Sequence, residues 1–311
     1  MPHAPLAAPE PALADASTTP LRLVPVAPDH IPDLARICHE AFSALHDRHA
    51  VPRDIPDVET GHLIIGMTAT RPDYTGVAAI LDGRIVGSNF LTFADEVAGV
   101  GPITVDPALQ SKGIGRALMQ WAVDEARRRG IRRTRLFQEA LNTTSLSLYT
   151  DLGFDWRDSS ALMQASPAPE DHPRVRPMTR ADLPDVDRIS RATFGHSRVN
   201  DAAVLLEAGL PAFILEAADA RPAGYLIATL FGHAGALPTD AGDGTENLLA
   251  LAAHAARQAP PPMARFICPL SRQDLFRAAL ARGHRTIKVL SSMSLGEYTP
   301  PPGPHFPSIQ C

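Results

Sequence analysis

The sequence predicts an α/β protein made of two related parts, each built on a mixed sheet with helices against it. From Leu21 onward, short β-branched runs alternate with segments whose apolar residues recur at helical spacing. In addition, residues 24–42 match residues 176–194 at one constant offset. The matching pairs are Pro25 and Pro177, Pro32 and Pro184, Asp33 and Asp185, Arg36 and Arg188, Ile37 and Ile189, and Phe42 and Phe194. A length of 311 residues is enough for two domains.

Composition narrows the class of protein. The chain is 45% hydrophobic and 20% charged, as expected of a soluble globular protein, and its net charge of −5 argues against a nucleic-acid or anionic-membrane partner. Its three cysteines lie far apart without metal-ligand spacing, which favours reduced thiols in the cytoplasm. No apolar run approaches the roughly 20 residues that span a bilayer, and we expect neither a signal peptide nor a bound metal.

The first part is expected to span residues 21–164, after a Pro/Ala-rich and disordered tail at residues 1–20. Residues 21–26 read as a strand and residues 29–41 as a helix. The runs 77–81 and 85–91 flank an Asp-Gly-Arg turn, which is a strong hairpin signal.

The segment from Val100 to Gly130 reads as a strand, a glycine-bearing turn and an amphipathic helix. The strand, Gly101–Val105, ends at Asp106-Pro107 because proline cannot continue a ladder. The first turn of a helix leaves backbone amides without partners, and glycines there let an anion approach closely. The turn at residues 110–116 therefore predicts a phosphate or pyrophosphate site flanked by positive charge.

The next elements are a strand at residues 132–139, a helix that begins after Asn142, and a last strand that begins at Phe154. Asn142 suits a helix start because its side-chain oxygen accepts bonds from first-turn amides. Gly153 stands where a helix C-terminal glycine is expected. Residues 165–173 read as a proline-rich linker, residues 174–298 as the second part, and residues 299–311 as a short tail.

Two motifs at this spacing resemble the signatures of the GNAT N-acetyltransferase superfamily. The first is Gln-x-x-Gly-x-Gly at residues 110–115, and the second is Asn142-x-x-Ser145-x-x-x-Tyr149-x-x-x-Gly153-Phe154. The resemblance implies two tandem GNAT-like domains, each with a central, mostly antiparallel sheet, and acetyl-CoA as cosubstrate. The cofactor-binding residues that it implies are Ile103, Thr104, Val105, Gln110, Ser111, Lys112, Gly113, Ile114, Gly115, Arg116, Asn142, Ser145 and Tyr149.

The resemblance also assigns roles. A backbone amide of the strand Gly101–Val105 would polarise the thioester carbonyl, the turn would hold the pyrophosphate, and Asn142 would bond to the pantetheine arm. Tyr149 stands where the family often has a tyrosine that protonates the departing thiolate.

The general base is left open by the sequence. Glu139 is a candidate because it lies near the end of the strand before Asn142. In some members of the resembled family a glutamate on that strand serves as base, but two residues earlier, where this chain has Phe137. Glu96 and the neighbouring Asp95 precede the cofactor strand and are also candidates. A third option is His46 or His49, and an ordered water is a fourth.

The second part has lost the signature. Its equivalent turn, residues 240–246, carries three acidic residues and no basic one, so it would repel a pyrophosphate. Glu246 aligns with Arg116, Arg272 with Asn142, and Ala279 with Tyr149. We therefore expect a degenerate second domain and one cofactor per chain.

The resulting hypothesis is an enzyme that transfers acetyl directly from acetyl-CoA to a primary amine of a small molecule or peptide. The alternative is a tandem scaffold that binds or senses acyl-CoA without turnover. The acidic second part weakly favours a cationic small-molecule acceptor, and fold does not imply substrate. The chain is expected to be a monomer or homodimer.

Overall fold

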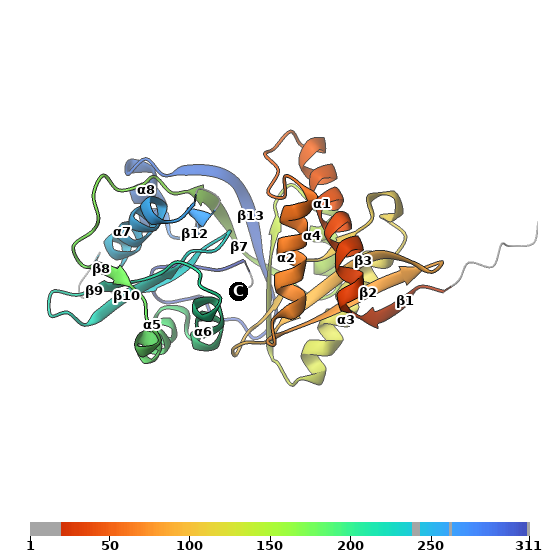
Figure 1. Ribbon diagram of the computed structural model, residues 1–311, viewed down its shortest axis with the longest axis horizontal. Coiled ribbons are helices and arrows are strands. Elements are labelled where there is room, and N and C mark those ends of the chain that lie inside the picture. Colours follow the sequence, from red (N-terminus) through yellow and green to blue (C-terminus); the bar gives the residue numbers. More distant parts are fainter. Residues whose placement is uncertain (1–19, 238–242, 261–262, 310–311) are drawn as a thin grey trace, which may run out of the picture.

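The computed structural model describes residues 20–237, 243–260 and 263–309, so most of the predicted N-terminal tail and residues 240–242 of the second turn lie outside the described residues (Figure 1). The elements of the first half are β1 (Arg22–Pro25), η1 (Pro28–His30), α1 (Ile31–Arg48), α2 (Val58–Thr70), β2 (Tyr74–Leu81), β3 (Arg84–Thr92), β4 (Ala98–Val100), β5 (Thr104–Val105), η2 (Pro107–Leu109), α3 (Ile114–Arg128), β6 (Arg133–Glu139), α4 (Thr143–Asp151) and β7 (Asp155–Gln164).

The second half repeats this order almost element for element, which confirms the predicted tandem organisation. Its elements are β8 (Val175–Pro177), η3 (Arg180–Asp182), α5 (Leu183–Phe194), α6 (Val199–Glu207), β9 (Ala212–Glu216), β10 (Pro222–Ile227), β11 (His233–Ala236), α7 (Asp243–Gln258), β12 (Arg265–Pro269), α8 (Gln273–Ala281), β13 (Arg285–Gly296) and β14 (His305–Phe306). Local geometry follows the alignment too. Asn142 and Arg272 are the N-cap residues of α4 and α8, and Gly153 and Gly283 follow those helices with positive φ.

Two sheets carry the fold: the larger is mixed and mostly antiparallel, as predicted, whereas the smaller is antiparallel throughout. The larger has the order β1-β2-β3-β4-β6-β13-β7-β12, with β5 also on β3, and the smaller has the order β14-β11-β10-β9-β8. The pairing of β4 with β6 is parallel, whereas the other pairings are antiparallel. Phe90 and Leu91 alternate on β3, so they face opposite sides: Phe90 packs with α1 and α2, and Leu91 packs with α3 and α4.

The two halves do not keep separate sheets, although the sequence divides at a linker. Strand β13 of the second half crosses into the larger sheet, where it pairs with β6 on one side and β7 on the other (Figure 1). Strand β12 extends the same sheet beyond β7. Strand pairing follows hydrogen bonds and apolar faces rather than chain order: Met293 of β13 is fully buried in the core that α3 and α4 cover. The predicted linker at residues 165–173 therefore does not divide the molecule into two separate sheets.

The predicted C-terminal tail is wrong for residues 305–306. They form β14, which pairs with β11 through Ala234 and Phe306. Phe306 is fully buried, and its ring stacks on Phe266 of β12 at 4.2 Å between centroids. Burial of an aromatic ring of this size outweighs the cost of ordering a short segment. The prolines at residues 300–304 led the sequence-based prediction to end the second part too early, at residue 298.

Other local differences are smaller. The expected strand Gly101–Val105 is regular only in β5, after β4 has ended at Val100. Helix α1 continues to Arg48, beyond the expected end at residue 41, and therefore includes His46. Among the described residues, no helix is both long and apolar enough to cross a membrane.

Candidate active site

The site begins where two neighbouring strands separate. Strands β4 and β6 are paired at Ala98–Thr134 and Gly99–Arg135. Beyond that point β5 stays with β3, whereas β6 keeps only its pairing with β13, which runs along its whole length on the other edge. Within the described residues, β5 is paired on one edge alone. Its other edge offers backbone amides and carbonyls to a ligand, because such groups need partners when water is excluded.

The glycine turn stands directly after this edge. Gly113 is the N-cap of α3 with φ of +82°, and no side chain caps the helix. The first helical bond is donated by the amide of Ala117 to the carbonyl of Gly113, at 3.0 Å. The amides of residues 113–116 therefore precede that ladder and face the helix N-terminus with its partial positive charge. A Cβ on Gly113 would meet nothing within 4 Å, so glycine is required there by backbone conformation.

Positive charge flanks the turn as expected. Lys112 is exposed, as are Gln110 and Ser111. Arg116 forms an ion pair with Asp151 of α4, and both side chains are more than half exposed. An exposed pair of this kind is worth about 1 kcal/mol or less, so a phosphate can compete for the guanidinium.

The second motif lies on α4. Asn142 caps this helix: its Oδ1 accepts a bond from the Ser145 amide at 3.1 Å. Tyr149 is 5% exposed and packs near Phe154 in the core beside β6. Burial raises the pKa of the Tyr149 phenol, although a hydrogen bond with Ser145 opposes this. The phenol is therefore protonated at neutral pH, which a proton donor requires.

A buried ionic cluster occupies the far end of β6. Glu139 Oε1 lies 2.6 Å from His46 Nε2 and 2.7 Å from Lys288 Nζ. Lys288 also pairs with Asp54, whose other oxygen lies 3.3 Å from a guanidinium nitrogen of Arg265. These side chains come from α1, the α1–α2 connection, β6, β12 and β13. The cluster therefore joins the two halves of the molecule.

The cluster keeps Glu139 charged. Burial alone would raise the pKa of its carboxyl, but the hydrogen bond from His46 and the charge of Lys288 outweigh burial and lower that pKa. His46, Asp54 and Glu139 also hold potential metal-ligand atoms within 4.8 Å of one another. The Lys288 ammonium lies within 3.5 Å of an atom of each, so the chain itself supplies a cation at this point. The expectation of no metal stays a prediction.

Several buried polar atoms around the strand separation have no hydrogen-bond partner in the described part of the chain. They are Ser88 Oγ, Thr104 Oγ1, both amide atoms of Gln138, Glu139 Oε2 and His46 Nδ1. Ser88 lies opposite Thr104 and shares the α1 face with Phe90, and Glu139 faces α1 through His46. Buried polar groups are normally satisfied, so a concentration of unsatisfied ones marks where a polar ligand fits.

Glu96, the other carboxylate predicted to be catalytic, lies far from Glu139. Glu96 lies two residues before Ala98, whereas Glu139 lies five residues after Thr134, the partner of Ala98. The separation along the sheet is roughly 20 Å at the usual rise per residue. Glu96 is 44% exposed and pairs with Arg191 of α5 at 2.7 Å.

Of the remaining base candidates, Asp95 lies with Glu96 at the contact between the halves, and only His46 lies beside Glu139. Asp95 accepts the amides of Asn200 and Asp201 at 3.1 Å, so Asp95, like Glu96, holds the halves together. His49 is exposed beyond the end of α1, whereas His46 is fully buried against Glu139.

Sequence reasoning missed Lys288 and Asp54. Lys288 lies 149 positions from Glu139, so no local spacing connects them. The sequence held one signal that pointed to Lys288. The chain has two lysines, and the other one, Lys112, lies in the glycine turn.

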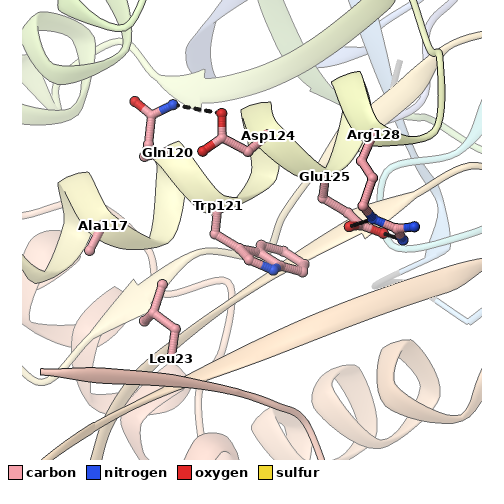
Figure 2. A pocket seen from close by; sticks show the side chains of 7 residues that line it. All are labelled: Leu23, Ala117, Gln120, Trp121, Asp124, Glu125 and Arg128. Carbon is pink, nitrogen blue, oxygen red and sulfur yellow. Dashed lines mark hydrogen bonds and ion pairs between the residues drawn. The ribbon is translucent and has the colours of Figure 1, made fainter.

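A hollow on the outer flank of α3 is a separate feature (Figure 2). It measures about 460 Å³ and is lined by Leu23, Ala117, Gln120, Trp121, Asp124, Glu125 and Arg128. Figure 2 shows Trp121 directed from α3 toward Leu23 of β1, while Gln120 bonds to Asp124 on the same helix. The hollow contains none of the predicted site residues, and the free edge and glycine turn define the candidate site better than this hollow does.

Comparison with known proteins decides the family of this region. Residues 32–154 match the model of the acetyltransferase (GNAT) family. This region is a GNAT domain. The match contains the glycine turn, the free edge of β5 and the α4 motif.

Two curated relatives match parts of the chain. The mycothiol acetyltransferase of Beutenbergia cavernae is 38% identical over 74 residues, which are 24% of this chain and 25% of that protein. The ribosomal protein bS18 alanine N-acetyltransferase of Escherichia coli K12 is 42% identical over 53 residues, which are 17% of this chain and 36% of that protein. The chain thus spans about a quarter to a third of the length of these relatives.

Solved structures match nearly the whole chain. A putative acetyltransferase from Pyrococcus horikoshii has a TM-score of 0.74 at 16% identity and covers 94% of each chain. A tandem GNAT protein from the clavulanic acid biosynthesis pathway has a TM-score of 0.59 at 15% identity, and covers 89% of this chain and 98% of that one. These likenesses show that the chain shares the fold of those structures over nearly its whole length.

Proposed function

We propose that the GNAT domain transfers an acetyl group from acetyl-CoA to a primary amine. The observation that carries this proposal is the free edge of β5, which leads directly into the uncapped N-terminus of α3. A ligand with an amide-rich arm and a pyrophosphate fits both features at once. Residues 110–116 would bind the pyrophosphate, and residues 103–105 would pair with the pantetheine arm.

The reaction follows from this placement. The amine nitrogen attacks the thioester carbonyl carbon, and a backbone amide of residues 103–105 stabilises the developing oxyanion. The carbon–sulfur bond then breaks, Tyr149 donates its phenolic proton to the departing thiolate, and the second proton lost by the attacking nitrogen restores the phenol. Asn142 keeps its amide nitrogen available for the cofactor, because capping of α4 uses its oxygen. The proton of the acceptor ammonium passes to a base near the end of β6.

The acceptor that we propose is a small molecule with a primary amine, or a peptide amine in second place. One relative is named for mycothiol and the other for an alanine of a ribosomal protein. The matched segments are too short to transfer either acceptor to this chain. The region around Glu139 is closely covered, with Glu139 at 8% exposure and His46 at 0%, which favours the smaller acceptor.

A scaffold that binds acyl-CoA without turnover is the second candidate. The observation that favours it is the burial of Tyr149 and His46, because neither side chain is presented to solvent. The glycine turn and free edge support cofactor binding equally well in both proposals, so binding alone does not distinguish them.

The test is a Tyr149→Phe variant compared with the wild-type protein. We expect calorimetry to give the same acetyl-CoA affinity within about threefold, and thiol release with a panel of amines to fall about 100-fold, the usual contribution of a general acid. Wild-type protein that binds acetyl-CoA but releases no thiol with any amine would establish the scaffold instead. Equal turnover by both proteins would remove Tyr149 from the mechanism.

A further inference from the structure

The two oxygens of Glu139 have different surroundings. Oε1 accepts bonds from His46 and Lys288, whereas Oε2 is buried and has no partner in the described part of the chain. The lowered pKa of this carboxyl makes Glu139 a weak proton acceptor, since a general base works best with a pKa near the operating pH. Glu139 is better suited to orient a neighbouring group.

His46 is that neighbour. Its Nε2 lies 2.6 Å from the ionised Glu139, so the hydrogen of the neutral imidazole is on Nε2 and is donated to Oε1. The lone pair is therefore on Nδ1, which is buried without a hydrogen-bond partner. An imidazole held in one tautomer by a carboxylate, with its other nitrogen free, is the usual arrangement of a histidine base.

Lys288 completes the arrangement from the second half. Its side chain is 4% exposed, and its ammonium is held between Glu139 and Asp54. It reaches this position because β13 is inserted beside β6, with Leu290 opposite Glu139. Lys288 thereby fixes Oε1 and keeps the Glu139 carboxylate charged.

We propose that His46 is the general base of this site, that Glu139 orients it, and that Lys288 is a positioning residue supplied by the second half. This inference rests on the proposed acetyl transfer. His46 Nδ1 takes one proton from the acceptor ammonium, and the freed amine attacks the thioester carbon. The carbon–sulfur bond breaks, the thiolate takes the Tyr149 proton, and the second proton lost by the attacking nitrogen restores the Tyr149 phenol. His46 is fully buried in the unliganded chain, so this role requires acceptor binding to open a path to Nδ1.

Charged groups from several elements surround His46. Glu139 from β6 lies 2.6 Å from its Nε2, and Lys288 from β13 lies 3.5 Å from the same atom. Asp54 from the α1–α2 connection pairs with Lys288 and with Arg265 of β12. Loss of the Lys288 ammonium would therefore remove one of the two groups that hold Glu139 Oε1 in place.

The first experiment is a His46→Gln variant. We expect kcat at pH 7 to fall at least about 100-fold with unchanged acetyl-CoA affinity, and to rise steadily with pH, because only the unprotonated amine then reacts. A variant that keeps kcat within about threefold of wild type, with the wild-type pH profile, would overturn the proposal.

The second experiment compares Lys288→Met with Arg71→Met. Arg71 is a matched control, because it is also a mostly buried cation that joins the halves, through Asp201 at 2.8 Å. We expect kcat to fall about tenfold in Lys288→Met with KM and acetyl-CoA affinity unchanged, because Oε1 loses one of its two donors, and kcat to stay unchanged in Arg71→Met. The same kcat in both variants would reduce Lys288 to a structural role.

The third measurement does not depend on turnover. A long-range proton–nitrogen NMR spectrum of the wild-type imidazoles should show His46 with hydrogen on Nε2, and a hydrogen on Nδ1 would contradict the orientation. Wild-type protein that binds acetyl-CoA without releasing thiol would remove both the proposed function and the base. In that case the NMR spectrum alone would test whether Glu139 and Lys288 orient the His46 imidazole.

Discussion

The two halves have the same order of elements but differ at one equivalent place, the outer edge of β5 in the first half and of β11 in the second. In the first half β4 and β6 pair briefly and then separate, which leaves the edge of β5 free. In the second half the equivalent strands β11 and β12 lie in different sheets, and β14 pairs with β11. The chain's own C-terminal segment thus occupies the edge that a cofactor arm would need. One cleft has kept room for a ligand, whereas the other has become part of the core.

The charges of the two clefts are also reversed. Arg116 on the first turn of α3 pairs with Asp151 at the end of α4. Glu246 on the first turn of α7 pairs with Arg282 just after α8. Both pairs connect the same two helices of the repeat, so the ion pair is kept while the sign near the helix N-terminus is inverted. Repulsion from Glu246 adds to the obstruction by β14.

The largest effect should be a loss of stability in the Phe306→Ala variant, which removes the β14 side chain buried in the second half. Truncation of a fully buried phenylalanine costs about 3 to 5 kcal/mol, because the ring's contacts with Phe266 are lost and a cavity remains. We expect chemical denaturation to show a loss of this size. Phe306→Leu is the control and should cost less. Acetyl-CoA should still bind once per chain. A second equivalent of bound acetyl-CoA would show that β14 alone excludes the cofactor.

The sequence predicted those parts of the molecule that depend on local chemistry. The glycine turn before α3, the capping role of Asn142 and the repeated helices all follow from short-range rules. Pairing between distant segments escaped prediction, because strand partners are chosen by the assembled sheet. The insertion of β13 and the pairing of β14 are of this kind. Lys288 was missed for the same reason, since its position beside Glu139 exists only after β13 crosses between the halves.

A smaller effect should follow when the first turn is given the charge of the second. The double change Lys112→Glu and Arg116→Glu places two carboxylates beside a pyrophosphate. We expect acetyl-CoA affinity to weaken about 100-fold at low salt, since each reversal replaces attraction with repulsion. Calorimetry at two salt concentrations measures this, and screening should reduce the loss at high salt.

The matched control for that experiment is Glu246→Arg in the second half. It restores a positive residue to the first turn of α7, where β14 still fills the neighbouring edge. We expect no change in stoichiometry or affinity. If the double reversal leaves the affinity within about threefold of wild type, the turn is not the pyrophosphate site and the comparison of the two clefts loses its electrostatic basis.

The smallest effect should come from Asp151→Asn. Asp151 pairs with Arg116 in the unliganded chain, so a phosphate must displace this carboxylate before the guanidinium is fully available. The pair is exposed and contributes about 1 kcal/mol or less, and loss of the Asp151 charge also removes a repulsion on the incoming anion. We expect acetyl-CoA to bind about twofold to fivefold more tightly at low salt, with the difference disappearing as salt rises. Arg282→Gln, which breaks the reversed pair in the second half, should leave the affinity unchanged. Weaker binding by Asp151→Asn would mean that the carboxylate positions Arg116 for the cofactor rather than competing with it.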